Sequence, residues 1–189
     1  MRKLIMWNLM TLDGYFEGVQ SNALSWFVFD DDMQDYIYAS EAEIGAYVFG
    51  RETYEMMAGY WPKAEGRTAD FMHAIPKVVF STTLESADWN NTTLIRGDVA
   101  GEIGRLKAQE GKDLFVIGSA DLSRTLMANG LIDEYRIAVN PVVLGKGTKL
   151  FQDVTARLDL KLLKSQVLGS GVVILHYEPL PEPRPSPHS

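Results

Sequence analysis

Three short segments of this sequence carry residue types that bind phosphate groups. Gly50, Arg51 and Thr53 combine a planar guanidinium fork, which matches phosphate oxygens, with a hydroxyl. Residues 81–83 read Ser-Thr-Thr, and their hydroxyls could contact a further phosphate or a ribose. Residues 118–122 read Gly-Ser-Ala-Asp-Leu, and small residues at the start of a helix let a pyrophosphate approach backbone N–H groups. Each segment alone is also explained as a turn, a surface ion pair or a cap, so the prediction depends on all three lying together.

Asp13 is the polar residue best placed to protonate a substrate, because it follows the first apolar run of the chain. If burial raised its pKa, the carboxyl could protonate or hydrogen-bond a nitrogen or oxygen of the substrate. The pair Asp13-Gly14 is equally typical of an ordinary turn. A cluster of aspartates offers an alternative acid but is better explained as the solvated start of a helix: Asp30, Asp31, Asp32 and Asp35. The aromatic residues that could line a ring-shaped substrate, if they are not simply core, are Trp26, Phe27 and Trp61.

The elements that would position these residues read as an α/β sheet. Apolar runs at 3–10, 46–49, 77–80 and 114–117 predict buried strands, and each of the last three leads directly into one of the phosphate-type segments. Helical patterns follow at 51–58 and after Ser119, so strands and helices alternate as in a sheet with crossover connections. Ligands of open α/β sheets bind outside the carboxyl ends of the strands. We therefore expect the three segments at one edge of the sheet.

The remaining segments complete this outline. Short strands are predicted at 15–19 and 92–96. One helix begins at the aspartates of 30–32, with Met33, Tyr36, Ile37 and Ile44 at helical spacing, and another is capped by Asp98 and ended by Gly111. Runs at 135–143, 158–168 and 172–177 predict longer strands, the last two joined by a Gly169-Ser170-Gly171 hairpin turn. The sheet should be mostly parallel with an antiparallel C-terminal hairpin, in one domain over 1–178, followed by a proline-rich tail at 179–189.

Composition narrows the classes of function. The chain has 189 residues and a net charge of −7, so it is a poor match for nucleic acid or an anionic membrane surface. It contains no cysteine and three scattered histidines, which speaks against a metal site and fits a reducing, cytoplasmic location. No apolar stretch is long enough to cross a bilayer. The sequence also lacks the G-x-G-x-x-G fingerprint, a P-loop and a G-x-S-x-G elbow.

Several motifs, in order along the chain, resemble the dihydrofolate-reductase-like superfamily. These are Thr11-Leu12-Asp13-Gly14, Gly50-Arg51-Glu52-Thr53-Tyr54-Glu55 and Gly118-Ser119 with the helix after it. A later block is most similar to the reductase domain of riboflavin-biosynthesis deaminase-reductases and its stand-alone relatives: Gly130-Leu131-Ile132-Asp133-Glu134-Tyr135, residues 140–147 and Leu150-Phe151. The resemblance covers about residues 2–178.

This resemblance implies an NADPH-dependent reductase with a mixed sheet of about eight strands and helices on both faces. It also implies a homodimer and a ribosylaminopyrimidine substrate, reduced at its sugar carbon by hydride from NADPH. The cofactor-binding residues it implies are Gly50, Arg51, Thr53, Ser81, Thr82, Gly118, Ser119, Asp121 and Leu122, and the candidate catalytic acid is Asp13.

Three departures from the family pattern bear on the substrate. The family usually has two glycines where this chain has Gly118-Ser119. Dihydrofolate reductases hold the folate tail with an arginine just before the strand at 77–80, but residues 74–77 here read Ala-Ile-Pro-Lys, which weakens the case for folate. The deaminase half of the bifunctional enzymes needs cysteine ligands for zinc, which this chain lacks. The alternatives left open are a dihydrofolate or pterin-type reductase, and a nucleotide-binding homodimer without catalysis.

Overall fold

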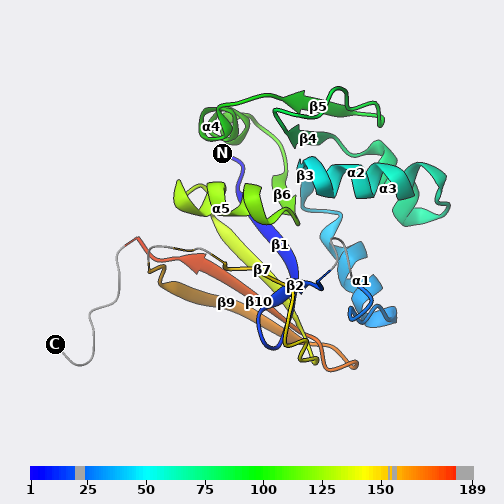
Figure 1. Ribbon diagram of the computed structural model, residues 1–189, viewed down its shortest axis with the longest axis vertical. Helices are drawn as coiled ribbons and strands as arrows, with labels where there is room; N and C mark the ends of the chain where they lie inside the picture. Colours follow the sequence, from blue (N-terminus) through cyan, green and yellow to red (C-terminus); the bar gives the residue numbers. More distant parts are fainter. Residues whose placement is uncertain (20–23, 153, 155–156, 182–189) are drawn as a thin grey trace.

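A computed structural model of the chain describes residues 1–19, 24–152, 154 and 157–181 (Figure 1). The strands of its main sheet are β1 (Leu4–Thr11), β3 (Ile44–Gly50), β4 (Lys77–Phe80), β5 (Thr92–Ile95), β6 (Asp113–Ile117), β7 (Glu134–Asn140), β9 (Leu160–Val167) and β10 (Val173–Pro179). They lie in the order β5-β4-β3-β6-β1-β7-β10-β9. The strands from β5 to β7 pair in parallel, whereas β10 runs antiparallel to both β7 and β9. The predicted mixed sheet with an antiparallel C-terminal hairpin is confirmed.

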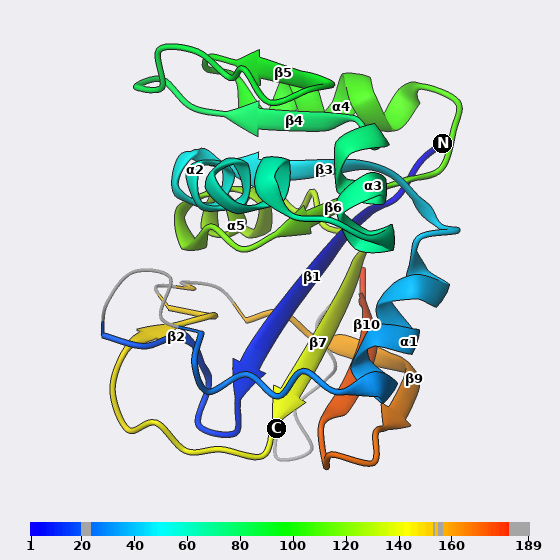
Figure 2. The same ribbon diagram turned by 90° about the vertical axis from the view of Figure 1, so that its right-hand side faces the viewer.

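Helices cover both faces of this sheet, as Figures 1 and 2 show. One face carries α4 (Val99–Ala108) and α5 (Ala120–Ala128). The other carries α1 (Asp31–Ser40), α2 (Arg51–Tyr60), a short 3-10 turn η1 (Trp61–Lys63) and α3 (Arg67–Ala74). Two further strands, β2 (Tyr15–Glu17) and β8 (Thr148–Lys149), form a small antiparallel sheet of their own. Among the helices of the described residues, none is long and apolar enough to cross a membrane.

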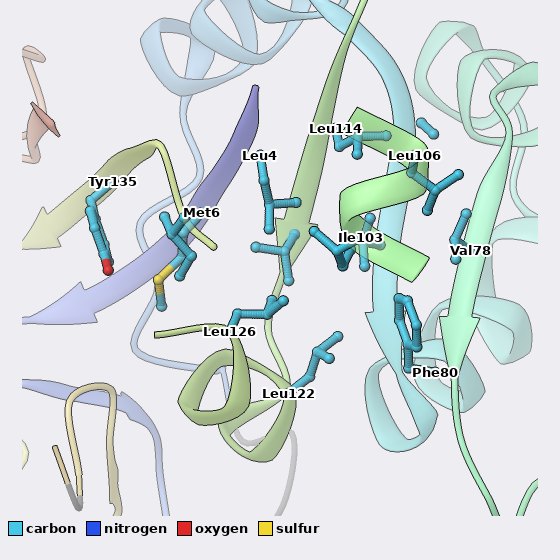
Figure 3. Packing of buried hydrophobic residues seen from close by; sticks show 14 of the residues in the cluster. Leu4, Met6, Val78, Phe80, Ile103, Leu106, Leu114, Leu122, Leu126 and Tyr135 are labelled. Atoms are coloured by element: carbon cyan, nitrogen blue, oxygen red, sulfur yellow. The ribbon is translucent and has the colours of Figure 1, made fainter. Parts of the chain in front are cut away.

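The alternation of side chains along β1 divides the core into two layers. Leu4 and Met6 point to the face of α4 and α5, where they pack with Ile103 and with leucines of those helices (Figure 3). Ile5 points to the opposite face, into a second cluster with Tyr54 of α2 and Met72 of α3. Because both faces of β1 are buried, its sequence is a nearly continuous apolar run. The strand is thereby fixed at the centre of the domain, with its C-terminal end at the edge where the predicted site lies.

Aspartate caps mark the starts of two helices. Asp30 caps α1 by accepting the Met33 N–H at 2.9 Å, and Asp98 caps α4 by accepting the Gly101 N–H at 2.9 Å. Both caps agree with the prediction. The four-residue strand predicted at 77–80 has the bounds of β4.

Some boundaries were predicted wrongly. Ile44 was expected on the helix that begins at the aspartates, but α1 ends at Ser40 and Ile44 opens β3. The helix capped by Asp98 ends at Ala108, before Gly111. No helix was expected over Arg67–Ala74, where α3 lies. Strand β10 extends to Pro179, into the predicted tail, whose residues 182–189 lie outside the described residues.

Candidate functional site

Two helices begin side by side at the carboxyl edge of the sheet. Helix α2 leaves β3 through Gly50, and α5 leaves β6 through Gly118 and Ser119. The two turns touch, because a Cβ on Gly50 would overlap the hydroxyl of Ser119. Among the residues that the structure describes, no side chain caps the first turn of either helix. The N–H groups of both first turns are therefore available to an anionic ligand, and both helix dipoles favour one.

The N-terminal ends of α2 and α5 line a cleft with a volume of about 460 Å³. We call it the polar cleft. It is lined by Phe16, Glu17, Gly50, Arg51, Glu52, Thr53, Phe80, Ser81, Thr82, Thr83, Gly97, Val99, Ser119, Ala120, Asp121, Leu122, Arg124, Thr125 and Thr148. The three phosphate-type segments of the sequence therefore meet in one cavity. Of the predicted cofactor-binding residues, only Gly118 is absent from this lining.

Two arginines supply positive charge to the polar cleft among the described lining residues. Arg51 donates to Glu52 at 3.2 Å and to Glu55 at 3.0 Å, and Arg124 donates to Asp121. The Arg51 pairs are solvent-exposed on both sides, and such pairs contribute little, so a phosphate could displace the carboxylates at low cost. The guanidinium of Arg51 can therefore exchange its carboxylate partners for a phosphate in the polar cleft, although the whole chain has a net charge of −7.

The turn after β6 differs from the expected phosphate contact. Gly118 N–H donates to Asn8 Oδ1 at 2.8 Å, so this amide is already paired within the protein. The first-turn amides that follow it remain available. Gly118 has φ +62° and Ser119 has φ +54°. Both residues have the left-handed backbone conformation that glycine adopts without strain, and for Ser119 that conformation costs about 1 kcal/mol.

Hydroxyl groups shape the rest of the polar cleft. Ser81 Oγ accepts the backbone N–H of Thr83 at 3.2 Å and of Leu84 at 2.9 Å, so it closes the turn after β4 while it lines the cleft. Thr53 is buried, with 5% of its surface exposed, and a Cβ on Gly118 would lie 2.7 Å from its Oγ1. A larger residue at 118 would therefore collide with Thr53.

Asp13 does not have the environment that was expected of an acid. Its carboxylate accepts the Thr11 hydroxyl at 2.7 Å, the Gly145 N–H at 2.7 Å and the Leu144 N–H at 3.2 Å. The Thr11 hydroxyl and these backbone donors lower the pKa of Asp13, although partial burial acts the other way. Acid catalysis by Asp13 was made conditional on a raised pKa, and these contacts act in the opposite direction. Nor does Asp13 line the polar cleft; it joins the turn after β1 to the 144–145 loop.

The aspartates of α1 are also directed elsewhere. Asp30 is the helix cap, and Asp32 accepts the Gly169 N–H at 2.7 Å. Asp32 and Asp35 line a separate cavity between α1, β9 and β10. None of these carboxylates lines the polar cleft, which agrees with their interpretation as the start of a helix.

A second cavity of about 310 Å³ adjoins the polar cleft and shares Phe16, Glu17 and Thr53 with it. We call it the apolar pocket. It is lined by Trp7, Asn8, Leu9, Phe16, Glu17, Leu24, Phe27, Phe29, Gln34, Ile37, Tyr47, Thr53, Met56, Met57, Trp61, Thr68, Met72, Ile117 and Gly118. Phe27 and Trp61 lie where a ring-shaped substrate was expected, whereas Trp26 is not in the lining. Gly118 lines the apolar pocket, and the next residue, Ser119, lines the polar cleft, so Gly118 lies at the boundary between the two cavities.

Sequence reasoning missed Asn8 and Glu17. Asn8 is 4% exposed and is the one amide side chain in the otherwise apolar run of β1, a placement that could have marked it. Glu17 lines both cavities from β2, and no motif or spacing pointed to it. Lys77, the one cation of the 74–77 stretch, is 1% exposed and donates to the carbonyls of Met72 and Ile75, each at 2.7 Å. Lys77 therefore binds carbonyl groups at the C-terminal end of α3, and it lines neither cavity.

Comparison with known sequences gives a match over nearly the whole chain. A family model described as the RibD C-terminal domain matches residues 2–174. The chain is 34% identical over 181 residues to the uncharacterized protein YyaP of Bacillus subtilis (strain 168), a match that spans 93% of this chain and 94% of that protein.

Solved structures share the fold. A putative riboflavin biosynthesis protein from Shewanella sp. PV-4 has a TM-score of 0.78 at 22% identity, over 94% of this chain and 99% of that one. A diaminohydroxyphosphoribosylaminopyrimidine deaminase/5-amino-6-(5-phosphoribosylamino)uracil reductase from Thermotoga maritima has a TM-score of 0.67 at 14% identity, over 95% of this chain and 57% of that one. Dihydrofolate reductase from Enterococcus faecalis, complexed with NADP(H), has a TM-score of 0.63 at 14% identity, over 94% of this chain and 96% of that one. The predicted dihydrofolate-reductase-like fold is confirmed.

Proposed function

The chain belongs to the RibD C-terminal domain family, and from this membership we propose that it is an NADPH-dependent reductase. The observation that carries the proposal is the contact between the two cavities. A cleft with two uncapped helix N-termini and two arginines meets an apolar pocket at Thr53, Phe16 and Glu17. A dinucleotide needs such a pair of environments, because its phosphates are charged and its nicotinamide ring must meet the substrate away from water.

The residues of the polar cleft fit the phosphates of NADPH. The first-turn amides of α5, from Ala120 onward, suit the pyrophosphate. Arg51, with Ser81 and Thr82 nearby in the same lining, suits the extra phosphate on the adenosine ribose. Asp121 and Leu122 complete the wall beside the pyrophosphate. The nicotinamide would then lie toward Gly118, where the polar cleft ends and the apolar pocket begins.

When bound, NADPH supplies a hydride to an electrophilic carbon of the substrate and becomes NADP⁺, while the adjacent nitrogen or oxygen of the substrate takes up one proton. The protein itself holds NADPH and the substrate in contact and keeps water away from the carbon that receives the hydride. By family resemblance the substrate is a ribosylaminopyrimidine of the riboflavin pathway. Glu17 stands at the junction of the cavities, where a carboxyl could exchange the proton with the substrate or with water.

A dihydrofolate reductase is the weaker candidate on this fold. Folate carries glutamate carboxylates that need a cation outside the ring pocket. The one cation of the 74–77 stretch, Lys77, has its ammonium buried against the carbonyls at the end of α3, and desolvation lowers its pKa to about 8. That ammonium is committed to the fold, which argues against a folate tail in that position.

We also propose that the protein is a homodimer that pairs through the C-terminal hairpin. Strand β9 lies at the edge of the main sheet and exposes Leu162 by 50%, Leu163 by 43% and Val167 by 71%. An exposed apolar edge strand is a place where a second chain can add to the sheet. Sedimentation of the intact protein would test this, and a monomer at all concentrations would remove the proposal.

Nicotinamide fluorescence during titration with NADPH tests the proposed function. Binding at micromolar NADPH followed by NADPH oxidation in the presence of a ribosylaminopyrimidine is the expected result. Dihydrofolate should be assayed beside it, to separate the two reductase candidates. NADPH binding without turnover of either substrate would favour a nucleotide-binding protein without catalysis. No binding at millimolar NADPH would overturn both reductase proposals.

A further inference from the structure

We infer that the cavity between α1, β9 and β10 binds a free α-amino acid as a zwitterion, with Lys164 of β9 contacting its carboxylate and Asp35 of α1 contacting its ammonium group. We call this space the α1 cavity, and its volume is about 420 Å³. Among the residues that the structure describes, it shares no lining residue with the polar cleft or the apolar pocket. The inference therefore concerns a second binding site and does not depend on the proposed reductase function.

One wall of the α1 cavity is a row of basic side chains on the main sheet. His176 of β10 pairs with Arg136 of β7 on one side and with Lys164 of β9 on the other. Residues that pair in this way point to the same face of a sheet, and all three line the cavity. Arg136 and His176 are each 7% exposed, whereas Lys164 is exposed. The row therefore runs from the protein interior to the solvent.

The other wall is one face of α1. Asp32, Asp35, Tyr36 and Ala39 follow the i, i+3, i+4, i+7 spacing that places side chains on one side of a helix, and all four line the cavity. The same helix packs on the sheet through Met33 and Tyr36. Acidic side chains of the helix and basic side chains of the sheet thus line the same cavity from its two walls.

Most charges around the α1 cavity already have partners within the protein. Arg136 donates to Glu134 and to Glu43, each at 2.7 Å, so two carboxylates balance its charge. Asp32 accepts the Gly169 N–H at 2.7 Å. These groups are occupied by the fold, and they leave few charges for a ligand.

Asp35 and Lys164 are the charges of the lining that remain for a ligand. In the part of the chain that the structure describes, neither side chain forms an ion pair or a hydrogen bond. The two have opposite signs and come from the two walls, yet they do not meet. A simple anion would pair with Lys164 but be repelled by Asp35, and a simple cation would have the reverse problem. An α-amino acid carries one charge of each sign on a compact frame, so it can pair with both.

The size and the polar groups of the α1 cavity suit such a ligand. Its volume lies within the range of small-molecule sites. Tyr36 is 9% exposed, and its hydroxyl is 3.1 Å from Nε2 of His176, so the ring is held in place. The half-buried amide of Gln166 adds a donor and an acceptor to the lining. These groups can hydrogen-bond the ligand beside its two charged groups.

A panel of free amino acids tests whether the site exists. Glycine, L-serine, L-glutamine, L-leucine, L-glutamate and L-lysine are titrated into the intact protein and followed by ligand-observed NMR. We expect at least one of them to bind with a dissociation constant in the millimolar range or below. No binding by any member of the panel would overturn the inference.

Derivatives of the amino acid that binds best test the two contacts. The N-acetyl derivative has no ammonium group and the carboxamide has no carboxylate, so each should bind about three- to tenfold more weakly. Asp35→Asn should weaken the free amino acid by a similar factor and leave the N-acetyl derivative unchanged. Lys164→Met should weaken the free amino acid and leave the carboxamide unchanged. Equal losses for the free amino acid and the matching derivative, or no loss for either, would overturn that contact.

Two variants outside the α1 cavity are the controls. Asp70→Asn and Lys112→Met each remove an exposed charge at a position that does not line the cavity, and neither should change the affinity. Asp35 and Lys164 are exposed as well, so all four variants should fold as the wild type does.

A crystal of the wild-type protein soaked with the same amino acid gives the position directly. The expected result places the carboxylate beside Lys164 Nζ and the ammonium group beside the Asp35 carboxylate. An amino acid bound in the polar cleft or in the apolar pocket would overturn the inference. A protein that binds the amino acid in the α1 cavity but does not bind NADPH would keep this site and lose the proposed function.

Discussion

Asn8 and Gly118 are joined across two neighbouring parallel strands, with Asn8 Oδ1 accepting the Gly118 N–H at 2.8 Å. Gly118 belongs to the turn that starts α5, and Asn8 lines the apolar pocket. One hydrogen bond therefore connects the segment proposed to hold the cofactor with the pocket proposed to hold the substrate. A shift of the turn on cofactor binding would therefore move the amide of Asn8, a side chain that lines the apolar pocket.

Arg51→Ala should weaken NADPH by about tenfold or more and NADH far less. The reason is that only NADPH carries the extra phosphate, and a charge-assisted hydrogen bond to it contributes about 1.5–3 kcal/mol. Titration of both cofactors by nicotinamide fluorescence measures the two losses. Arg105→Ala removes an exposed arginine on α4, outside the polar cleft, and should change neither affinity. Equal losses for NADPH and NADH would show that Arg51 has been given the wrong role.

Ser119→Gly should stabilise the protein by up to about 0.5 kcal/mol, because glycine removes the cost of about 1 kcal/mol of a serine in the left-handed conformation and loses part of that gain through its larger unfolded-state entropy. Urea denaturation checks the free energy of unfolding. Ser86→Gly is the control, since Ser86 is not among the described residues with positive φ, and it should be neutral or destabilising. A loss of stability in Ser119→Gly would mean that the hydroxyl against Gly50 contributes more than the backbone conformation costs.

Asp13→Asn separates the two roles considered for this carboxylate. Because Asp13 accepts hydrogen bonds from Thr11, Leu144 and Gly145, we expect the substitution to lower the melting temperature and to leave kcat unchanged. The depressed pKa of Asp13 means that its stabilising effect is present above the unfolded pKa and is lost as the pH falls through the folded value. The wild type and the variant should therefore converge in melting temperature at acidic pH. A fall in kcat with an unchanged melting temperature would restore the role of catalytic acid.

Glu134 should make the protein sensitive to acid. Burial acts to raise its pKa, but hydrogen bonds from His176 and Arg136 outweigh it, and the pKa is lowered to about 2. The stability that this carboxylate contributes is fully present above its unfolded pKa of about 4.3 and is lost as the pH falls toward 2. Glu134→Gln should cost about 3 kcal/mol at pH 7. The difference from wild type should shrink below pH of about 4.

The control for Glu134 is Glu178→Gln, which breaks an exposed pair with Lys161 and should cost less than about 1 kcal/mol at any pH. Denaturation curves across the acid range provide the measurement. A Glu134→Gln variant that keeps a constant difference from wild type down to pH 2 would contradict the assigned pKa.

Sequence patterns predicted those elements whose side chains are buried on both faces. Strand β4 has a Val-Val-Phe run that can only be interior, and its bounds were predicted correctly. Helix α3 was missed because only Ala69 and Met72 of its eight residues are buried, so its apolar pattern is too sparse to recognise. Ile44 fits the spacing of α1, yet it pairs with Asp113 in the sheet. Local spacing cannot report that tertiary pairing.

The candidate site was predicted at the level of segments but not of atoms. The turns at Gly50, Ser81 and Ser119 meet as expected, because parallel strands place their carboxyl ends at one edge. Two facts depend on contacts between residues far apart in sequence: the Gly118 amide is held by Asn8, and the Asp13 carboxylate is held by the 144–145 loop. Neither contact can be predicted from the local sequence. Hence an acid and a phosphate donor were assigned to groups already engaged elsewhere.

Two of the residues that line both cavities, Phe16 and Glu17, lie on a very short strand. Phe16 and Glu17 stand on the three-residue β2, whose partner β8 has two residues, and this pair forms a sheet apart from the main one. So short a ladder opens locally at far lower free energy than the whole domain unfolds. Amide protons of β2 should consequently exchange with solvent deuterium much faster than those of β1. Occupancy of either cavity should slow that exchange, because Phe16 and Glu17 of β2 line both cavities.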